Sequence, residues 1–104
     1  MNREVVFAPE ALGDLRALYD VIALDAGTGR AQSYTDRIIA HCLGLATFPE
    51  RGTHGDDLRP GLRITTWRRR VTIAFHITGT TVAIDRILYG GRDLTAIFEE
   101  NDHD

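Results

Sequence analysis

The sequence predicts an α+β fold with the element order β-α-α-β-β-β-α, in which a helical hairpin packs on a small antiparallel sheet. Two observations favour this fold. Apolar residues recur at helical spacing in the first half of the chain, and they alternate with polar residues in the second half. A chain of 104 residues suits a single compact unit, so we expect one domain over residues 1–104, with a frayed acidic tail at residues 101–104.

The N-terminal part of the chain predicts a strand followed by two helices. Residues 3–8 carry consecutive apolar residues that are typical of a short strand. Pro9 suits the first turn of a helix, because its missing N–H is not needed there, and this helix should end at Gly27. A second helix is expected over residues 30–48, with Pro49 stopping it. The link between the helices is so short that they should run antiparallel.

The C-terminal part predicts three strands and a last helix. A polar loop over residues 50–61 should precede them. The strands are expected over residues 62–67, 70–77 and 82–89, with a turn at residues 78–81 and a short helix over residues 92–100. One face of the middle strand is apolar, and it carries Val71, Ile73, Phe75 and Ile77. We expect that face to receive the helical hairpin.

Composition excludes several classes of protein. No apolar run approaches the roughly 20 residues of a membrane helix, and the N-terminus lacks the pattern of a signal peptide, so we expect a cytoplasmic protein with no membrane partner. Cys42 is the only cysteine and lies on an apolar helical stripe, which indicates a buried, inert thiol. No metal-ligand, P-loop or dinucleotide-binding spacing is present, so we expect neither a metal nor another cofactor.

Charge is distributed unevenly along the chain. The net charge is −3, but residues 51–92 hold eight arginines and three acids, whereas residues 93–104 hold five acids and no base. Every one of the 12 basic residues is arginine, so any bound anion meets planar, permanently charged guanidinium groups. This pattern predicts a local basic surface, formed by side chains that converge from separate strands.

Six arginines lie on or beside the last three strands: Arg63, Arg68, Arg69, Arg70, Arg86 and Arg92. Strand geometry would place Arg68 and Arg70 on one face and Arg69 on the other. The simpler interpretation of Arg68 and Arg69 is a solvated hairpin tip.

Arg86 and Arg92 each allow two interpretations. Arg86 interrupts an apolar row of Val82, Ile84 and Leu88, where a charge needs a partner or an opening to water. It forms either a structural ion pair with an acid from a helix or a functional anion site. Arg92 follows the end of the last strand, and it either belongs to a functional surface or pairs with the acidic tail.

Three segments resemble the ParE-type toxins of the RelE/ParE superfamily. They are Pro9–Leu15 after the short strand, Phe48–Gly52 followed by Asp57–Arg63, and the last strand with its internal arginine and its Gly/Arg-rich exit, Ile84–Asp93. The resemblance spans residues 3–98 and depends on the order and spacing of these segments together. It implies the RelE/ParE fold and the toxin component of a type II toxin–antitoxin system, of the kind associated with plasmid stabilization.

The resemblance also implies partners. Such toxins are neutralised by a co-expressed ParD-like antitoxin, a ribbon-helix-helix protein that binds operator DNA, so the toxin meets that DNA only through the antitoxin in a hetero-oligomer. An antitoxin segment would lay an apolar helix face in a groove or add a strand to a sheet edge. The residues expected to bind it are Leu18, Tyr19, Ile22, Trp67 and Phe98.

The resemblance leaves two mechanisms open. ParE relatives poison DNA gyrase without being enzymes, and RelE relatives are ribosome-dependent mRNA endonucleases, which need a base, an acid and cations at the phosphate. Target-binding candidates for the poison are Arg63, Arg70, Arg86 and Arg92. Candidates for the nuclease are Arg70, Arg92, His76 and Tyr89.

The gyrase poison is the favoured mechanism, with no catalytic residue expected. The chain has no lysine, and Phe98 stands where a RelE-like site would have a tyrosine. A third possibility is a family member that binds its antitoxin without being toxic.

Overall fold

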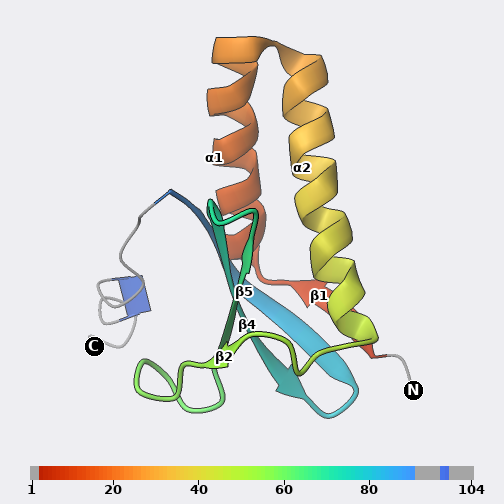
Figure 1. The fold of residues 1–104 in the computed structure, drawn as a ribbon, viewed down its shortest axis with the longest axis vertical. Coiled ribbons are helices and arrows are strands. Elements are labelled where there is room, and N and C mark those ends of the chain that lie inside the picture. Colours follow the sequence, from red (N-terminus) through yellow and green to blue (C-terminus); the bar gives the residue numbers. More distant parts are fainter. Residues whose placement is uncertain (1–2, 91–96, 99–104) are drawn as a thin grey trace.

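The computed structural model of the chain describes residues 3–90 and 97–98 (Figure 1). Two helices stand side by side as a hairpin on a five-stranded sheet, which has the order β1-β5-β4-β3-β2. The elements are β1 (Glu4–Phe7), α1 (Pro9–Ala26), α2 (Thr28–Leu43), the 3₁₀ turn η1 (Gly44–Ala46), β2 (Thr53–His54), β3 (Arg63–Trp67), β4 (Val71–Thr78) and β5 (Thr81–Tyr89). The predicted α+β fold is confirmed.

The sheet is mixed, whereas the sequence pattern predicts an antiparallel one. β1 pairs with β5 in parallel, and the other three strand pairs are antiparallel. Residues 53–54, expected in a loop, form β2 at the edge of the sheet beside β3. Neither feature has a local signal, because the direction and the partner of a short strand are set by where the rest of the chain places its neighbour.

The helix boundaries follow from local signals. α1 begins at Pro9 and ends before Gly27, whose φ of 93° is unfavourable for a residue with a side chain. The N–H of Gly27 donates to the carbonyl of Ala23. Because this one glycine makes the link, α2 begins at Thr28, two residues earlier than predicted. Its C-terminal end tightens into η1 instead of continuing as an α-helix to Phe48.

The core lies between the helical hairpin and one face of the sheet. Val71, Ile73 and Phe75 of β4 are all 0% exposed, so the apolar face predicted from their alternation is confirmed. The buried residues that the helices contribute to this core are Ala11, Leu15, Leu18, Ile38 and Cys42. Figure 1 shows that the helices extend beyond the sheet, which explains why Leu24 near their tip is 90% exposed.

A smaller cluster joins Leu62, Ala74 and Phe98. Phe98 is 1% exposed, and the guanidinium of Arg59 lies 4.7 Å from the centre of its ring. Ile97 and Phe98 are helical. The remaining positions of the helix expected over residues 92–100, and the frayed tail expected at 101–104, lie outside the described residues.

A β-bulge changes the pattern of β5. Phe75 pairs with Ile84 and Ala74 pairs with Arg86, so the pairing passes over Asp85. This extra residue brings Ile87, and not Arg86, into the core row with Val82 and Ile84. The predicted row of Val82, Ile84, Arg86 and Leu88 is therefore wrong, because strict alternation does not survive a bulge.

The buried thiol of Cys42 is expected to be unreactive. Burial raises its pKa from the ordinary value of 9.0 to about 12. Since the thiolate is the reactive form, we expect a maleimide to label the folded chain at least about a hundredfold more slowly than the unfolded chain at mildly alkaline pH. Because the pKa is raised in the folded state, the thiol's contribution to stability is present below pH 9.0 and is lost as the pH rises toward about 12. Equal labelling rates would contradict the burial.

Candidate functional site

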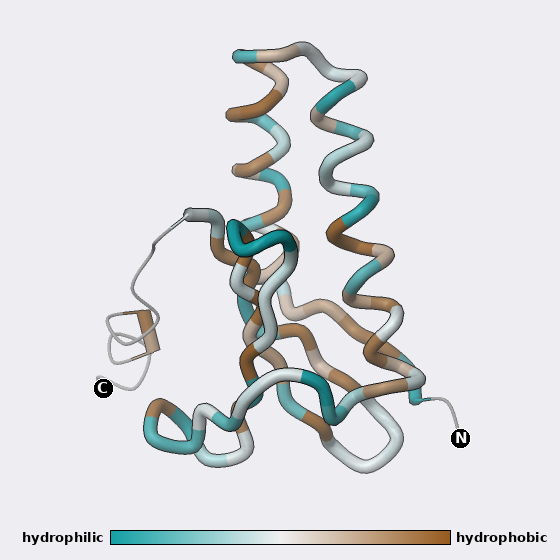
Figure 2. Tube along the Cα trace, viewed as in Figure 1, coloured by the Kyte–Doolittle hydropathy of each residue, from teal (hydrophilic) through white to brown (hydrophobic). Residues whose placement is uncertain are grey.

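The hairpin between β3 and β4 ends in three consecutive arginines, the most hydrophilic stretch of that hairpin in Figure 2. Arg68 and Arg69 have φ values of 54° and 60°, and the N–H of Arg70 donates to the carbonyl of Trp67 at 3.2 Å. Two central residues with positive φ are the requirement of a tight type I′ turn. The extended geometry that would have alternated these side chains between two faces is therefore absent here.

The three guanidinium groups of this turn are available to an anion. Arg68, Arg69 and Arg70 are exposed, and none of them forms an ion pair with a residue in the described part of the chain. The guanidinium of Arg68 lies 4.8 Å from the centre of the Trp67 ring, a cation–π contact that restricts its motion. We call residues 68–70 the arginine turn.

An aromatic cluster supports the base of the arginine turn. Tyr34 of α2 meets Trp67 edge-on, with ring centres 5.1 Å apart, and Tyr89 at 6.3 Å. Burial raises the pKa of Tyr34, with a smaller raising effect from Tyr89, while Arg70 and Arg68 act in the opposite direction. The N–H of Gly90 donates to the carbonyl of Arg70 at 2.8 Å and so attaches the end of β5 to the turn.

A groove runs beside this surface, between α1 and the end of β5. Its lining residues are Asp14, Ala17, Leu18, Val21, Ile87 and Tyr89. It opens where β1 has ended, because the last residue of β5 that pairs with β1 is Ile84. Val21 is 64% exposed and Tyr89 is 41% exposed. Tyr89 belongs to both the groove and the aromatic cluster, so the groove adjoins the arginine turn.

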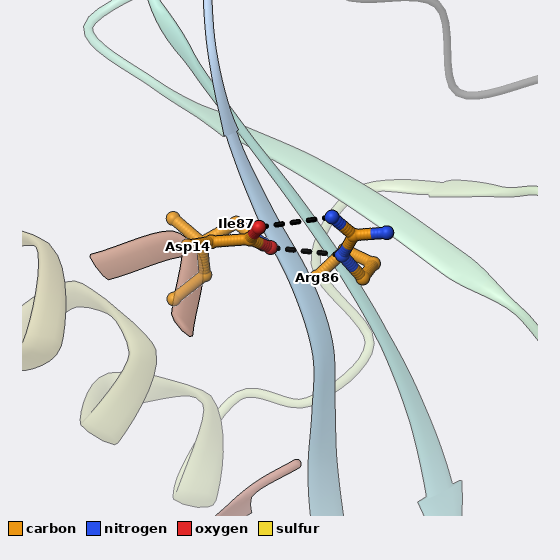
Figure 3. A network of polar contacts seen from close by, with 3 residues as sticks. All are labelled: Asp14, Arg86 and Ile87. Carbon is orange, nitrogen blue, oxygen red and sulfur yellow. Dashed lines mark hydrogen bonds and ion pairs between the residues drawn. The ribbon is translucent and has the colours of Figure 1, made fainter. Parts of the chain in front are cut away.

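Asp14 closes the unpaired edge of β5 at the base of the groove (Figure 3). Its carboxylate accepts hydrogen bonds from Nε and Nη2 of Arg86 and from the backbone N–H of Ile87, each at 2.9 Å. The hydrogen bond to Asp14 raises the pKa of Arg86 further. Of the two interpretations of Arg86, the structure contains the ion pair with a helical acid.

Of the other predicted arginines, Arg63 and Arg86 do not converge with Arg70. Arg63 pairs with Phe75 at the opposite end of β3, where its Nη1 donates to the carbonyl of Glu50 at 3.4 Å. The four-residue separation of Arg63 and Trp67 along β3 corresponds to roughly 13 Å. Arg92 lies outside the described residues. Among the described arginines, the basic groups that lie together are therefore those of one local turn, formed by neighbours in the sequence.

Two of the five residues expected to bind an antitoxin are buried in the chain by itself. Leu18 is 8% exposed and Phe98 is 1% exposed, while Tyr19, Ile22 and Trp67 are half-buried. The large apolar side chains of α1 that are exposed are instead Leu12, Val21 and Leu24. Sequence reasoning missed Val21 and Leu24 because they lie off the core stripe, and that position of large aliphatic residues was the available signal.

His76 contacts Asp85 elsewhere on the sheet. Its Nδ1 lies 2.7 Å from Oδ2 of Asp85, and the His76 side chain is 37% exposed. The described residues hold no cluster of three or more histidine, cysteine or acidic side chains suited to a metal ion. No helix in the described ranges is long and apolar enough to cross a membrane.

Known proteins are similar to this chain in sequence and in fold. The model of the family described as the ParE toxin of the type II toxin–antitoxin system parDE matches residues 5–94. Toxin ParE3 of Caulobacter vibrioides is 32% identical over 87 residues, which cover 81% of this chain and 83% of that protein. The structure of the chromosomal ParDE toxin–antitoxin system from P. aeruginosa matches with a TM-score of 0.74 at 24% identity, covering 85% of this chain and 96% of that one.

The fold and these matches define the class of protein as the toxin of a type II toxin–antitoxin system. Within this class, the chain belongs to the ParE toxin family. The resemblance inferred from Pro9–Leu15, Phe48–Gly52 and Ile84–Asp93 is confirmed. An antitoxin partner follows from this membership.

Proposed function

We propose that this toxin acts in the cytoplasm as a non-enzymatic poison of DNA gyrase and that a ParD-like antitoxin neutralises it. The observation that carries the proposal is the exposed arginine turn, which lies beside an open groove and forms no ion pair with any residue that the structure describes. Guanidinium groups remain protonated at neutral pH and cannot accept a proton. Such a surface suits the binding of an anionic partner better than proton transfer. Of the predicted target-binding residues, Arg70 belongs to the arginine turn. Arg63 and Arg92 stay predictions.

The groove between α1 and β5 suits the antitoxin. An amphipathic helix can place apolar side chains between Val21 and Tyr89, as helix-in-groove partners do. Tyr89 also supports the arginine turn through Tyr34, so an occupant of the groove would lie against the basic surface and restrict access to it. In this arrangement, operator DNA is reached only through the ribbon-helix-helix part of the antitoxin.

One observation favours the alternative of an mRNA endonuclease. A carboxylate that orients an imidazole, as Asp85 does with His76 at 2.7 Å, is a common arrangement for a general base. However, Arg70, which directly precedes β4, is six residues from His76 in that strand, or roughly 20 Å away. A base and cations at that separation do not act on the same phosphate, so the poison remains the proposal.

The proposal is tested with purified gyrase, supercoiled DNA and ATP. We expect the chain to accumulate covalent gyrase–DNA adducts, and we expect mRNA to stay intact in a translation reaction. The antitoxin should suppress the adducts. For the Val21→Arg variant, suppression should need at least about tenfold more antitoxin. A charge buried in the apolar interface should weaken the binding free energy of the antitoxin by more than about 1.4 kcal/mol.

Three outcomes would contradict the proposal. Cleavage of ribosome-bound mRNA at a defined codon position would assign the nuclease activity instead. If neither adducts nor cleavage are found, and cells that express the chain without the antitoxin grow normally, the chain is a non-toxic member of the family. Full suppression of the Val21→Arg variant, with Arg37→Val on the exposed face of α2 as the control substitution, would place the antitoxin elsewhere.

A further inference from the structure

The arginine turn has a backbone conformation that arginine disfavours. Residues with a Cβ atom rarely adopt positive φ, and type I′ turns prefer Asn-Gly for that reason. The five other described residues with positive φ are all glycine, including Gly79 in the turn that joins β4 to β5. Arg68 and Arg69 are therefore the only described residues with a Cβ atom that adopt positive φ. Strained residues of this kind cluster at binding sites.

The main-chain N–H and carbonyl of Arg70 are already bonded within the chain. The N–H of Arg70 bonds to Trp67, and its carbonyl accepts from Gly90. A peptide strand that docked here would find neither of these groups free for pairing. What the turn offers to a partner is therefore its guanidinium groups, of which Arg68 is held in place over the Trp67 ring.

We propose that the arginine turn is a binding site for the phosphate backbone of DNA. Guanidinium groups bind phosphate oxygens in bidentate fashion, and duplex DNA presents a dense row of such charges. The chain has a net charge of −3, so its general field repels a polyanion, and binding must be local. The inference rests on the proposed function, because it gives the poison a direct contact with the DNA that gyrase holds.

An acidic peptide is the competing ligand. Peptide partners of folded domains gain affinity from strand pairing or from apolar side chains in a groove. The N–H and carbonyl of Arg70 are not free for strand pairing, and the lining of the adjoining groove includes Tyr89 but none of the arginines. A phosphate backbone needs only charge and geometry, which the turn supplies.

The test measures binding of the purified chain to a short fluorescent duplex DNA at several salt concentrations. Each guanidinium–phosphate contact contributes about −0.9 to the slope of log affinity against log salt, so three contacts predict a slope of about −2.7. In the variant Arg68→Asn/Arg69→Gly, we expect a slope of about −0.9 and at least about tenfold weaker binding at low salt. The same variant should have a higher melting temperature, since Asn-Gly suits both positive φ values.

A gain in thermal stability combined with a loss of DNA binding separates a binding role from a structural one. The control is Arg30→Gln/Arg37→Gln, which removes two exposed arginines from α2. It should bind DNA with the wild-type slope. A parallel slope loss in this control, or unchanged binding by the turn variant, would overturn the inference. So would polyglutamate that competes with the DNA as well as unlabelled duplex does.

Gyrase reactions distinguish the failure of this inference from the failure of the proposed function. If the chain binds DNA through the turn but forms no gyrase–DNA adducts, the gyrase proposal is contradicted and the DNA-binding site is supported. If the wild-type chain forms adducts but does not bind DNA by itself, the DNA-binding site is contradicted and the gyrase proposal is supported.

Discussion

Replacing Asp14 with alanine is expected to lower the free energy of unfolding by about 3 kcal/mol. The Asp14 and Arg86 side chains are only 11% and 18% exposed, and the substitution leaves a half-buried guanidinium and the N–H of Ile87 without their shared acceptor. Breaking one partner of such a pair costs more than the pair contributes, because the remaining charge stays desolvated. Urea unfolding followed by circular dichroism measures the difference.

A matched control separates this effect from loss of surface charge. Asp20 on the same helix pairs with Arg16 at 3.5 Å, but these side chains are 59% and 79% exposed. Exposed pairs contribute little, so Asp20→Ala should cost less than about 0.5 kcal/mol. Similar costs for Asp14→Ala and Asp20→Ala would show that Asp14 does not close the edge of β5 as described.

The substitution Gly52→Ala is expected to destabilise the chain by about 3 kcal/mol. Gly52 has a φ of 85°, and a Cβ atom there would collide with the backbone carbonyl of Ile64 on β3. That carbonyl belongs to the sheet and cannot move aside without disturbing the pairing of β2 with β3. The melting temperature and the urea midpoint should both fall.

Gly61→Ala provides the comparison for this prediction. Gly61 has a similar φ of 81°, but open space surrounds the position of its Cβ. It should lose only the conformational cost, about 1 kcal/mol. Equal costs at both positions would mean that conformation alone, and not the close approach to β3, requires Gly52.

Part of the candidate site was predictable from the sequence. The concentration of arginines over residues 51–92 indicated a basic surface, and the arginine turn lies within it. We expected arginines from several strands to converge, but Arg63 lies at the far end of β3 and Arg86 binds Asp14. An ion pair between residues separated by 72 positions has no signature in a local pattern.

The conformation of the arginine turn could not be predicted from the sequence either. Arginine disfavours positive φ, so propensity argues against a tight turn at Arg68 and Arg69. The turn forms because Trp67 pairs with Val71 and Val71 pairs with Tyr89 in the sheet, which leaves three residues to reverse the chain. Tertiary pairing therefore overrides the local preference at this site.

The amino-acid sequence by itself determined the α+β class, the helical hairpin, the apolar face of β4 and the ParE family, because periodicity and motif order are local properties that survive folding. Tertiary structure decided the parallel pairing of β1, the bulge at Asp85, the partner of Arg86 and the position of the groove. These features depend on which distant segments meet, and the free energy of that meeting belongs to pairs of segments and not to either segment alone.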